Sequence, residues 1–176
     1  MKKIVFYFLL LVFCLSCEEP VIFKDDELSL PKQEYTGKEL KIDGYYYIKF
    51  NNIFEVFFLY KDGIITYAGT IPIEDLSERE KRFQNGEFYN HIKNIKFFWG
   101  VFNIKNNQIL YERWCPSEPP YRTYVREGNI INDTTFVITK LFRMVNGKKT
   151  EESELNEVYH FKQFSPKPDS TNKFIK

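Results

Sequence analysis

The sequence predicts an all-β fold, an antiparallel up-and-down meander of eight or nine strands that closes into a barrel. Short aromatic or β-branched runs recur over residues 40–164, separated by turn signals such as Asp62-Gly63 and Asn146-Gly147. Connections this short join antiparallel neighbours, because parallel strands need crossovers of a dozen or more residues. Closing eight such strands removes exposed edges, although a sandwich gives the same hairpin signals and stays an alternative.

The expected strands follow one another along the chain. They cover residues 44–50, 53–60, 64–71, 95–104, 108–115, 121–126 with 130–131, 135–145 and 155–164. The one longer connection contains a charged stretch, Asp75 to Gln84, in which Leu76 and Phe83 have helical spacing. We therefore expect one short helix inserted near residues 74–92, on the surface against one end of the sheet.

The N-terminus has the pattern of a secretory leader. Lys2 and Lys3 precede an uncharged apolar run of 12 residues, Ile4 to Leu15. A membrane-spanning helix needs about 20 such residues, so this run is typical of a signal-peptide core. Leu15-Ser16-Cys17 resembles the lipobox of bacterial lipoproteins. That resemblance implies cleavage before Cys17, lipid (palmitate) on this cysteine and anchoring in a membrane.

Composition divides the remaining chain. Residues 17–37 are polar and acidic without a clear period, so we expect a flexible tether between the lipid and the domain. The domain is expected over residues 38–164. Residues 165–176 (SPKPDSTNKFIK) are expected to form a disordered tail.

Charge and cysteine content exclude several classes of protein. Without the leader, 23 basic residues face 24 acidic ones, which argues against nucleic acid as a partner. Only Cys115 then remains as a free thiol, so no internal disulfide forms, and the role of this cysteine stays open. His91 and His160 lie in no zinc-like spacing, and no nucleophile or phosphate-loop motif occurs. We expect a monomer that is not an enzyme, with no catalytic residue, metal or cofactor.

The strand order resembles the lipocalin-like (calycin) barrel of small bacterial lipoproteins. The residues that carry this resemblance are Asp43-Gly44-Tyr45-Tyr46-Tyr47, the run Trp99 to Ile104, and the hairpins that follow to Phe164. Tyr46 stands where true lipocalins have tryptophan. The resemblance implies an envelope protein of the outer membrane, on the periplasmic face or the cell surface.

Alternation along each strand predicts which side chains face the barrel interior. The expected inward sets are Phe54, Val56, Phe58 and Tyr60; Phe98, Phe102 and Ile104; Ile109, Tyr111 and Arg113; and Phe136, Ile138 and Phe142. An eight-stranded barrel can hold side chains or one small ligand. The candidate ligand-binding residues are Phe58, Tyr60, Phe102, Tyr111 and Arg113, with Arg113 either gripping a carboxylate or head group or stacking on an aromatic ring.

Two functions from different classes fit these expectations. The first is binding of a small apolar or amphipathic ligand in the barrel. The second is a structural or protein-interaction lipoprotein of the envelope, with a filled core and no ligand. The second predicts an exposed aromatic patch, for which Trp114 and the loop Pro116–Pro120 are the candidates.

Overall fold

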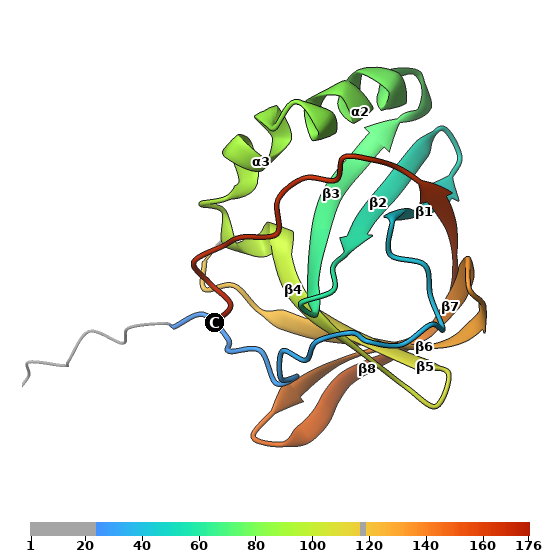
Figure 1. Ribbon diagram of the computed structural model, residues 1–176. Helices are drawn as coiled ribbons and strands as arrows, with labels where there is room; N and C mark the ends of the chain where they lie inside the picture. Colours follow the sequence, from blue (N-terminus) through green and yellow to red (C-terminus); the bar gives the residue numbers. More distant parts are fainter. Residues whose placement is uncertain (1–23, 117–118) are drawn as a thin grey trace, which may run out of the picture.

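A computed structural model describes residues 24–116 and 119–176, and in this part eight antiparallel strands close into a barrel in sequence order (Figure 1). The strands are β1 (Gly44–Phe50), β2 (Ile53–Leu59), β3 (Ile64–Pro72), β4 (Trp99–Lys105), β5 (Gln108–Trp114), β6 (Thr123–Asn132), β7 (Thr135–Val145) and β8 (Lys148–Gln163). Pairing of β1 with β8, Gly44 opposite Gln163, closes the sheet. The predicted fold class is confirmed, and the sandwich alternative is wrong. The predicted signal peptide and Cys17 lie outside the described residues.

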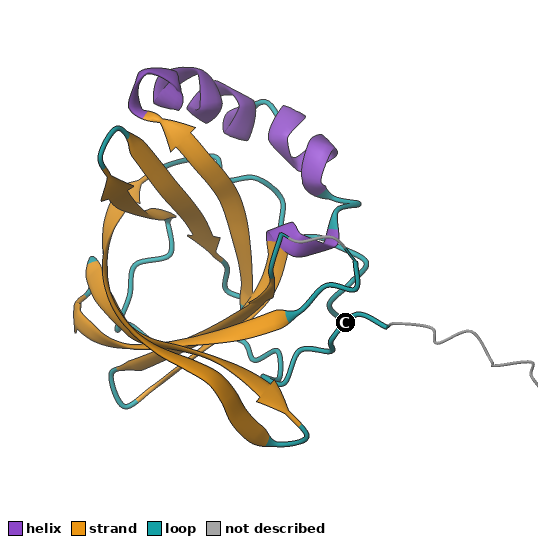
Figure 2. Ribbon diagram, turned by 180° about the vertical axis from the view of Figure 1, so that it is seen from behind, coloured by secondary structure: helices purple, strands orange, loops and turns teal. Residues whose placement is uncertain are grey.

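The insertion between β3 and β4 contains more than one helix. It consists of a 3₁₀ turn (Ile73–Asp75), α2 (Leu76–Gln84), α3 (Glu87–Ile92) and a second 3₁₀ turn (Lys96–Phe98). Gly86, at φ 80°, separates the two helices in a conformation that other residues rarely adopt. Both helices lie outside the strands on one side of the barrel (Figures 1 and 2). Among the described residues, no helix is long and apolar enough to cross a membrane.

Several strand boundaries differ from the sequence prediction, and β4 begins at Trp99 rather than at residue 95. β6 runs without a break through Gly128, which was expected to be in a turn. A Cβ atom at Gly128 would lie 2.1 Å from the carbonyl oxygen of Val137, so the glycine serves a close approach of two strands. β8 begins at Lys148 rather than Leu155, because the charged stretch 148–154 pairs with the end of β7 as an exposed hairpin.

Apolar side chains form two clusters, one on each side of the barrel wall. The inner cluster lies in the interior and includes Tyr46, Phe57, Phe102, Tyr111 and Tyr159. The outer cluster lies between the strands and the helices and includes Tyr45, Phe58, Phe83, Phe88, Trp99 and Trp114. Tyr45 also donates a hydrogen bond to Glu80 of α2 (2.7 Å), which fixes the helix to the barrel.

Residues 24–43 form an N-terminal strap that is part of the folded domain. Asp26 accepts two hydrogen bonds from Arg143, both at 2.9 Å, and Glu112 accepts hydrogen bonds from the backbone of Ser29 and Leu30. Tyr35 enters the inner cluster. The prediction of a flexible tether is therefore wrong for residues 24–37. Their polar side chains, which suggested a solvated linker, pair with specific groups on β5 and β7.

Residues 165–176 form a C-terminal strap on the outside of the barrel. Lys167 donates hydrogen bonds to the carbonyl oxygens of Ile42 (2.6 Å) and Leu59 (2.7 Å). Tyr60 donates to the carbonyl of Pro168 (2.9 Å), and Phe174 and Ile175 pack against the outer cluster. The expected disordered tail is wrong, because the prolines and polar residues of this segment cover an apolar surface that the strands alone leave bare.

Candidate functional site

The inward face of β2 is the opposite of the predicted one. Glu55 and Phe57 face the interior, whereas Phe58 and the following Tyr60 lie in the outer cluster. Phe54 and Val56 also lie on the outer side. The prediction took the face with more apolar residues as inward. Both faces of this strand are buried, because α2 and the C-terminal strap cover the outside, so polarity does not distinguish them.

Two more inward assignments are wrong for similar reasons. Phe98 precedes β4 in a 3₁₀ turn and packs against the outer cluster. Leu141 lies opposite Arg126, whose side chain points into the barrel, so Leu141 faces inward. Phe142, the next residue, lies opposite Val125 and faces outward. A register irregularity after Ile138 shifts the alternation of β7, which sequence spacing does not reveal.

The remaining candidate residues lie where they were expected. Phe102 and Tyr111 belong to the inner cluster, and Arg113 is 4 % exposed among them. Phe136, Ile138, Ile104 and Ile109 also contact this cluster. Of the five candidate ligand-binding residues, the barrel therefore brings three together and places Phe58 and Tyr60 outside.

Sequence reasoning missed four polar residues that join Arg113 inside the barrel. These are Glu55, Tyr67, Arg126 and Glu157. Each lies in a strand among large apolar neighbours, as does Arg113. The available signal was the two-residue spacing of Glu55 from Phe57 and of Glu157 from Tyr159, both members of the inner cluster.

Arg113 is held mainly by aromatic rings. Its guanidinium carbon lies 4.2 Å from the centre of the Tyr67 ring and 5.7 Å from that of Phe57. Its Nη2 is 3.9 Å from a Glu55 oxygen, which is too long for a hydrogen bond. Nη1 donates to the carbonyl of Trp114 (3.3 Å). The guanidinium is thus oriented by stacking and leaves donors without a carboxylate.

Arg126 forms a second, similar arrangement. Its Nε lies 3.9 Å from Glu157, and its guanidinium carbon is 5.7 Å from the centre of the Tyr111 ring. Glu157 instead accepts a hydrogen bond from the Tyr159 hydroxyl (3.0 Å). The centre of the Phe57 ring lies 5.6 Å from that of Tyr111 and 5.8 Å from that of Tyr159. Since Phe57 also lies next to Arg113, its ring packs between the surroundings of the two arginines.

Several buried donors in this group have no hydrogen-bond partner among the described residues. They are Nε of Arg113, Nε and Nη1 of Arg126, and the hydroxyl of Tyr111. A buried polar group left without a partner costs about 1–3 kcal/mol, and more for a charged group. Four such atoms close together favour a site for an acceptor-rich ligand over a purely structural core.

The protonation states make this interior rich in donors. Burial raises the pKa of Glu55, although Arg113 and Arg126 counteract the effect. Burial likewise raises the pKa of Tyr111 to about 12, so its hydroxyl keeps its proton at neutral pH. Both guanidiniums stay charged. Any protonation of Glu55 leaves the arginines with less compensating negative charge.

One end of the barrel is closed by the N-terminal strap. The backbone N–H of Tyr35 donates to the carbonyl of Lys61, and that of Lys41 donates to Asp133, so the strap spans two turns at this end. Glu55, third in β2, and Arg113, next to last in β5, lie toward the other end. The side chains of Glu55 and Glu157 are 17 % and 20 % exposed, so solvent reaches the polar group there.

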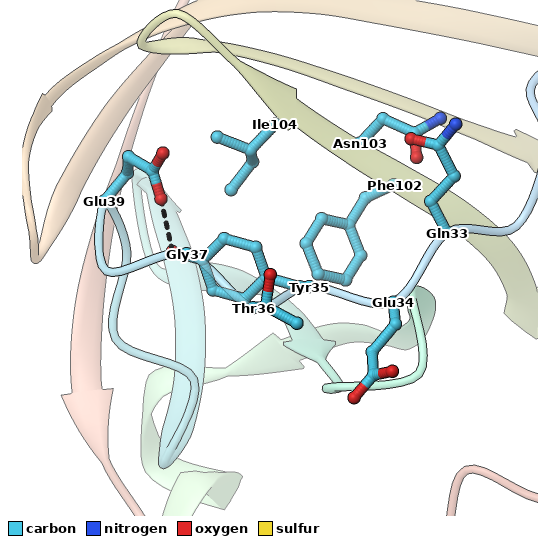
Figure 3. A pocket seen from close by; sticks show the side chains of 9 residues that line it. All are labelled: Gln33, Glu34, Tyr35, Thr36, Gly37, Glu39, Phe102, Asn103 and Ile104. Carbon is cyan, nitrogen blue, oxygen red and sulfur yellow. Dashed lines mark hydrogen bonds between the residues drawn. The ribbon is translucent and has the colours of Figure 1, made fainter.

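A shallow cavity of about 190 Å³ lies where the strap crosses β4 (Figure 3). Tyr35 and Phe102 face each other in it with ring centres 5.8 Å apart, and Tyr35 donates to Glu39 (3.2 Å). Small-molecule sites usually begin at about 300 Å³. This shallow cavity above the closed end is therefore too small to be a candidate ligand site.

Trp114 is not part of an exposed aromatic patch among the described residues. Trp114 is 3 % exposed and donates its ring N–H to the carbonyl of Asp26 in the strap (2.7 Å). The strap that was taken for a tether covers this ring. Cys115, the neighbouring residue, is a half-buried free cysteine.

Comparison with known proteins gives no relative. No family model, curated protein or solved structure matches the chain. Within residues 24–116 and 119–176, no three His, Cys, Asp or Glu side chains are grouped to hold a metal ion. The barrel interior itself is thus the basis for a functional assignment.

Proposed function

We propose that this protein is a membrane-anchored lipoprotein of the cell envelope whose barrel binds a small amphipathic ligand with an anionic head group, without catalysing a reaction. The observation that carries the proposal is the set of unpartnered donors on Arg113, Arg126 and Tyr111 inside the barrel. A carboxylate or phosphate accepts several hydrogen bonds at once, and its charge matches the two guanidiniums.

The surroundings favour an amphipathic ligand over a small inorganic anion. Phe57 and Phe102 provide apolar contact next to the arginines. Ligand sites of this kind are mainly apolar, with a few polar groups that fix orientation. Glu55 and Glu157 keep the cluster from carrying a large positive charge, which favours a ligand bound by hydrogen bonds and apolar contact together.

Anchoring is proposed from the N-terminal sequence. Lys2 and Lys3, the short apolar run and Leu15-Ser16-Cys17 have the order of a lipoprotein leader. Lipid on Cys17 would hold the barrel at a membrane, on the periplasmic face or the cell surface. The mass of the protein extracted from its membrane tests this part directly, since acyl chains on Cys17 add a defined mass to the chain beginning there.

The ligand proposal is tested with a matched pair of probes. A long-chain fatty acid and the alcohol of the same chain length differ only in the head group. We expect the acid to bind at least about tenfold more tightly, as expected for one charge-assisted hydrogen bond. Arg113→Met with Arg126→Met should remove this preference. Arg122→Met, with a side chain 58 % exposed, is the matched control.

A structural lipoprotein with a filled core is the second candidate. The inner rings pack closely: Phe136 and Tyr159 stack 4.9 Å apart at 14°, and Tyr46 lies 5.0 Å from Phe136. This candidate predicts no saturable binding of either probe. Equal, weak partitioning of acid and alcohol, unchanged in the double arginine variant, would favour it over the ligand proposal.

A further inference from the structure

A second hollow lies outside the barrel, between the two straps. This groove has a volume of about 500 Å³. Its apolar lining comes from both straps and from β4 and β5: Leu28, Leu30, Val101, Trp114, Phe174 and Ile175. It is separated from the inner cluster by the barrel wall, because Trp114, Phe174 and Ile175 all pack in or against the outer cluster.

Lysines surround the apolar lining of the groove. Lys32, Lys96, Lys173 and Lys176 all line it. Lys96 is engaged, since it pairs with Asp25 (2.8 Å) and lies 4.5 Å from the centre of the Trp114 ring. Lys32, Lys173 and Lys176 are exposed and make no ion pair within the described part of the chain.

Acidic residues compensate little of this charge. Asp26 and Glu27 are the carboxylate side chains that line the groove, and Asp26 is already bound by Nε and Nη2 of Arg143. Glu27 thus faces Lys32 and Lys173, two exposed lysines without an ion pair in the described part of the chain. The groove therefore combines an apolar lining with a net positive edge, in a chain whose basic and acidic residues are otherwise nearly balanced.

The groove lies next to the point where the strap begins. The beginning of the described N-terminal strap and the C-terminal end of the chain lie side by side in both views (Figures 1 and 2). Lys24 is seven positions after Cys17 in the sequence. A chain segment of that length spans at most about 25 Å. A lipid on Cys17 would thus hold the beginning of the N-terminal strap, and the groove beside it, within about 25 Å of the membrane surface.

We propose that the groove between the straps binds an anionic phospholipid of the membrane. The phosphate accepts hydrogen bonds from the exposed lysines, and the upper part of an acyl chain lies on Leu28, Leu30 and Phe174, close to the buried Trp114. The orientation of this face rests on the proposed anchoring through Cys17. The groove chemistry does not, because apolar lining and free lysines are properties of the described residues alone.

The test uses the whole protein, extracted from its membrane and reconstituted into vesicles. One set contains phosphatidylcholine only, part of it with brominated acyl chains, which quench nearby tryptophan. In the other set, phosphatidylglycerol with brominated acyl chains is mixed into unbrominated phosphatidylcholine. Trp114 lines the groove, whereas the other tryptophan, Trp99, donates its ring N–H to Ile92 beneath the helices. We expect stronger quenching from brominated phosphatidylglycerol than from brominated phosphatidylcholine at the same bromine content.

Charge reversal tests whether the lysines of the groove bind the anionic lipid. Lys32→Glu with Lys173→Glu should raise the phosphatidylglycerol fraction needed for half-maximal quenching at least about fivefold, since one lysine near an anionic surface contributes a factor of that size. The control, Lys105→Glu with Lys148→Glu, reverses two exposed lysines at strand ends away from the groove. Its tryptophan fluorescence should be quenched at the same phosphatidylglycerol fraction as that of the wild type.

Two results would overturn the inference. One is equal quenching by the two brominated lipids. The other is quenching that the Lys32→Glu, Lys173→Glu variant leaves unchanged. Slower amide exchange of residues 24–32 and 171–176 with phosphatidylglycerol is a second readout, independent of the tryptophans. The mass of the same preparation reports lipid on Cys17, so failure of the groove and failure of the anchor are distinguishable.

Discussion

The two sides of the barrel wall hold aromatic clusters that differ in how their polar atoms are satisfied. In the outer cluster, Tyr45 donates to Glu80 and Tyr60 to Pro168, while Trp99 and Trp114 donate to backbone carbonyls. In the inner cluster, Tyr111 and the adjoining arginines keep donors without partners. Satisfied polar groups add to stability, and unsatisfied ones reduce it. The outer cluster is therefore suited to holding the fold, and the inner one to binding.

The largest expected effect is loss of stability from the outer cluster. Phe58 is fully buried beneath α2 and contacts Phe83 with ring centres 5.1 Å apart. Phe58→Ala should lower the free energy of unfolding by about 3–5 kcal/mol, through lost burial and the cavity left behind. Urea denaturation measures this. Ile131→Ala, at a side chain 62 % exposed, should change it by less than about 0.5 kcal/mol. A similar loss in both variants would contradict the assignment of Phe58 to a packed core.

A smaller loss of stability is expected when the contacts of the N-terminal strap are removed. Asp26→Ala removes two hydrogen bonds from Arg143 and one from the Thr123 backbone, and should cost about 1–3 kcal/mol. Burial raises the pKa of Asp26, but these hydrogen bonds outweigh it and lower the pKa overall. This contribution is therefore present at neutral pH and lost as the pH falls below about 4. Glu27→Ala is the neighbouring exposed control. Equal stability of the two variants from pH 3 to 7 would mean that the strap is a tether after all.

The C-terminal strap gives a pH effect of the same sign in a higher pH range. Burial lowers the pKa of Lys167 to about 8, despite Asp43 and Asp62 nearby. Between pH 8 and the higher pKa of the unfolded chain, the unfolded state holds more protons, so stability should rise with pH. From pH 7.5 to 9.5 we expect a gain of roughly 1–2 kcal/mol relative to Lys167→Met. Lys173→Met should follow the wild type. If the stability of Lys167→Met rose as much between pH 7.5 and 9.5 as that of the wild type, the effect would belong to other groups.

The smallest expected effect concerns the inner cluster and ligand binding. Glu55 competes with an anionic ligand for Arg113, so Glu55→Gln should tighten binding of a long-chain alkyl sulfonate a few-fold at pH 7. Since burial raises the pKa of Glu55, wild-type binding should strengthen as the pH falls through that pKa. The sulfonate itself stays ionised. Glu157→Gln offers a comparison, because the Tyr159 hydroxyl already engages this carboxylate. Parallel pH profiles of wild type and Glu55→Gln would contradict this role.

The sequence was sufficient for the barrel, because turn signals and short connections restrict both strand order and strand direction. It was insufficient for the faces of β2. The predicted inward face of β2 contained Phe58 and Tyr60 and left Glu55 on the opposite face. In the structure Glu55 lies inside the barrel near Arg113, and Phe58 and Tyr60 lie outside. Alternation gives the inward face only when one face is solvated. Here the helices and the C-terminal strap bury the second face.

The straps were missed for a related reason. Their composition is that of linkers, but both straps make specific hydrogen bonds to residues far away in the sequence. In the N-terminal strap, Ser29 bonds to Glu112 and Asp26 to Arg143, and in the C-terminal strap Lys167 bonds to Ile42, over 83 to 125 positions. Local patterns contain no information about partners so distant. Phe102, Tyr111 and Arg113, the three candidate residues that lie inside the barrel as predicted, are on β4 and β5. In these two strands the inward face was the one with regularly alternating apolar residues.

Native mass spectrometry of the protein extracted from its own membrane tests the central claim most directly. The account predicts a bound anionic amphiphile on the wild type, retained in Arg122→Met and lost in the Arg113→Met, Arg126→Met variant. Lipids held in the outer groove are distinguished by the Lys32→Glu, Lys173→Glu variant, which should keep the barrel ligand. A wild-type spectrum without such an adduct, or one whose adduct persists when both buried arginines are replaced, would contradict the assignment of the barrel interior as a binding site.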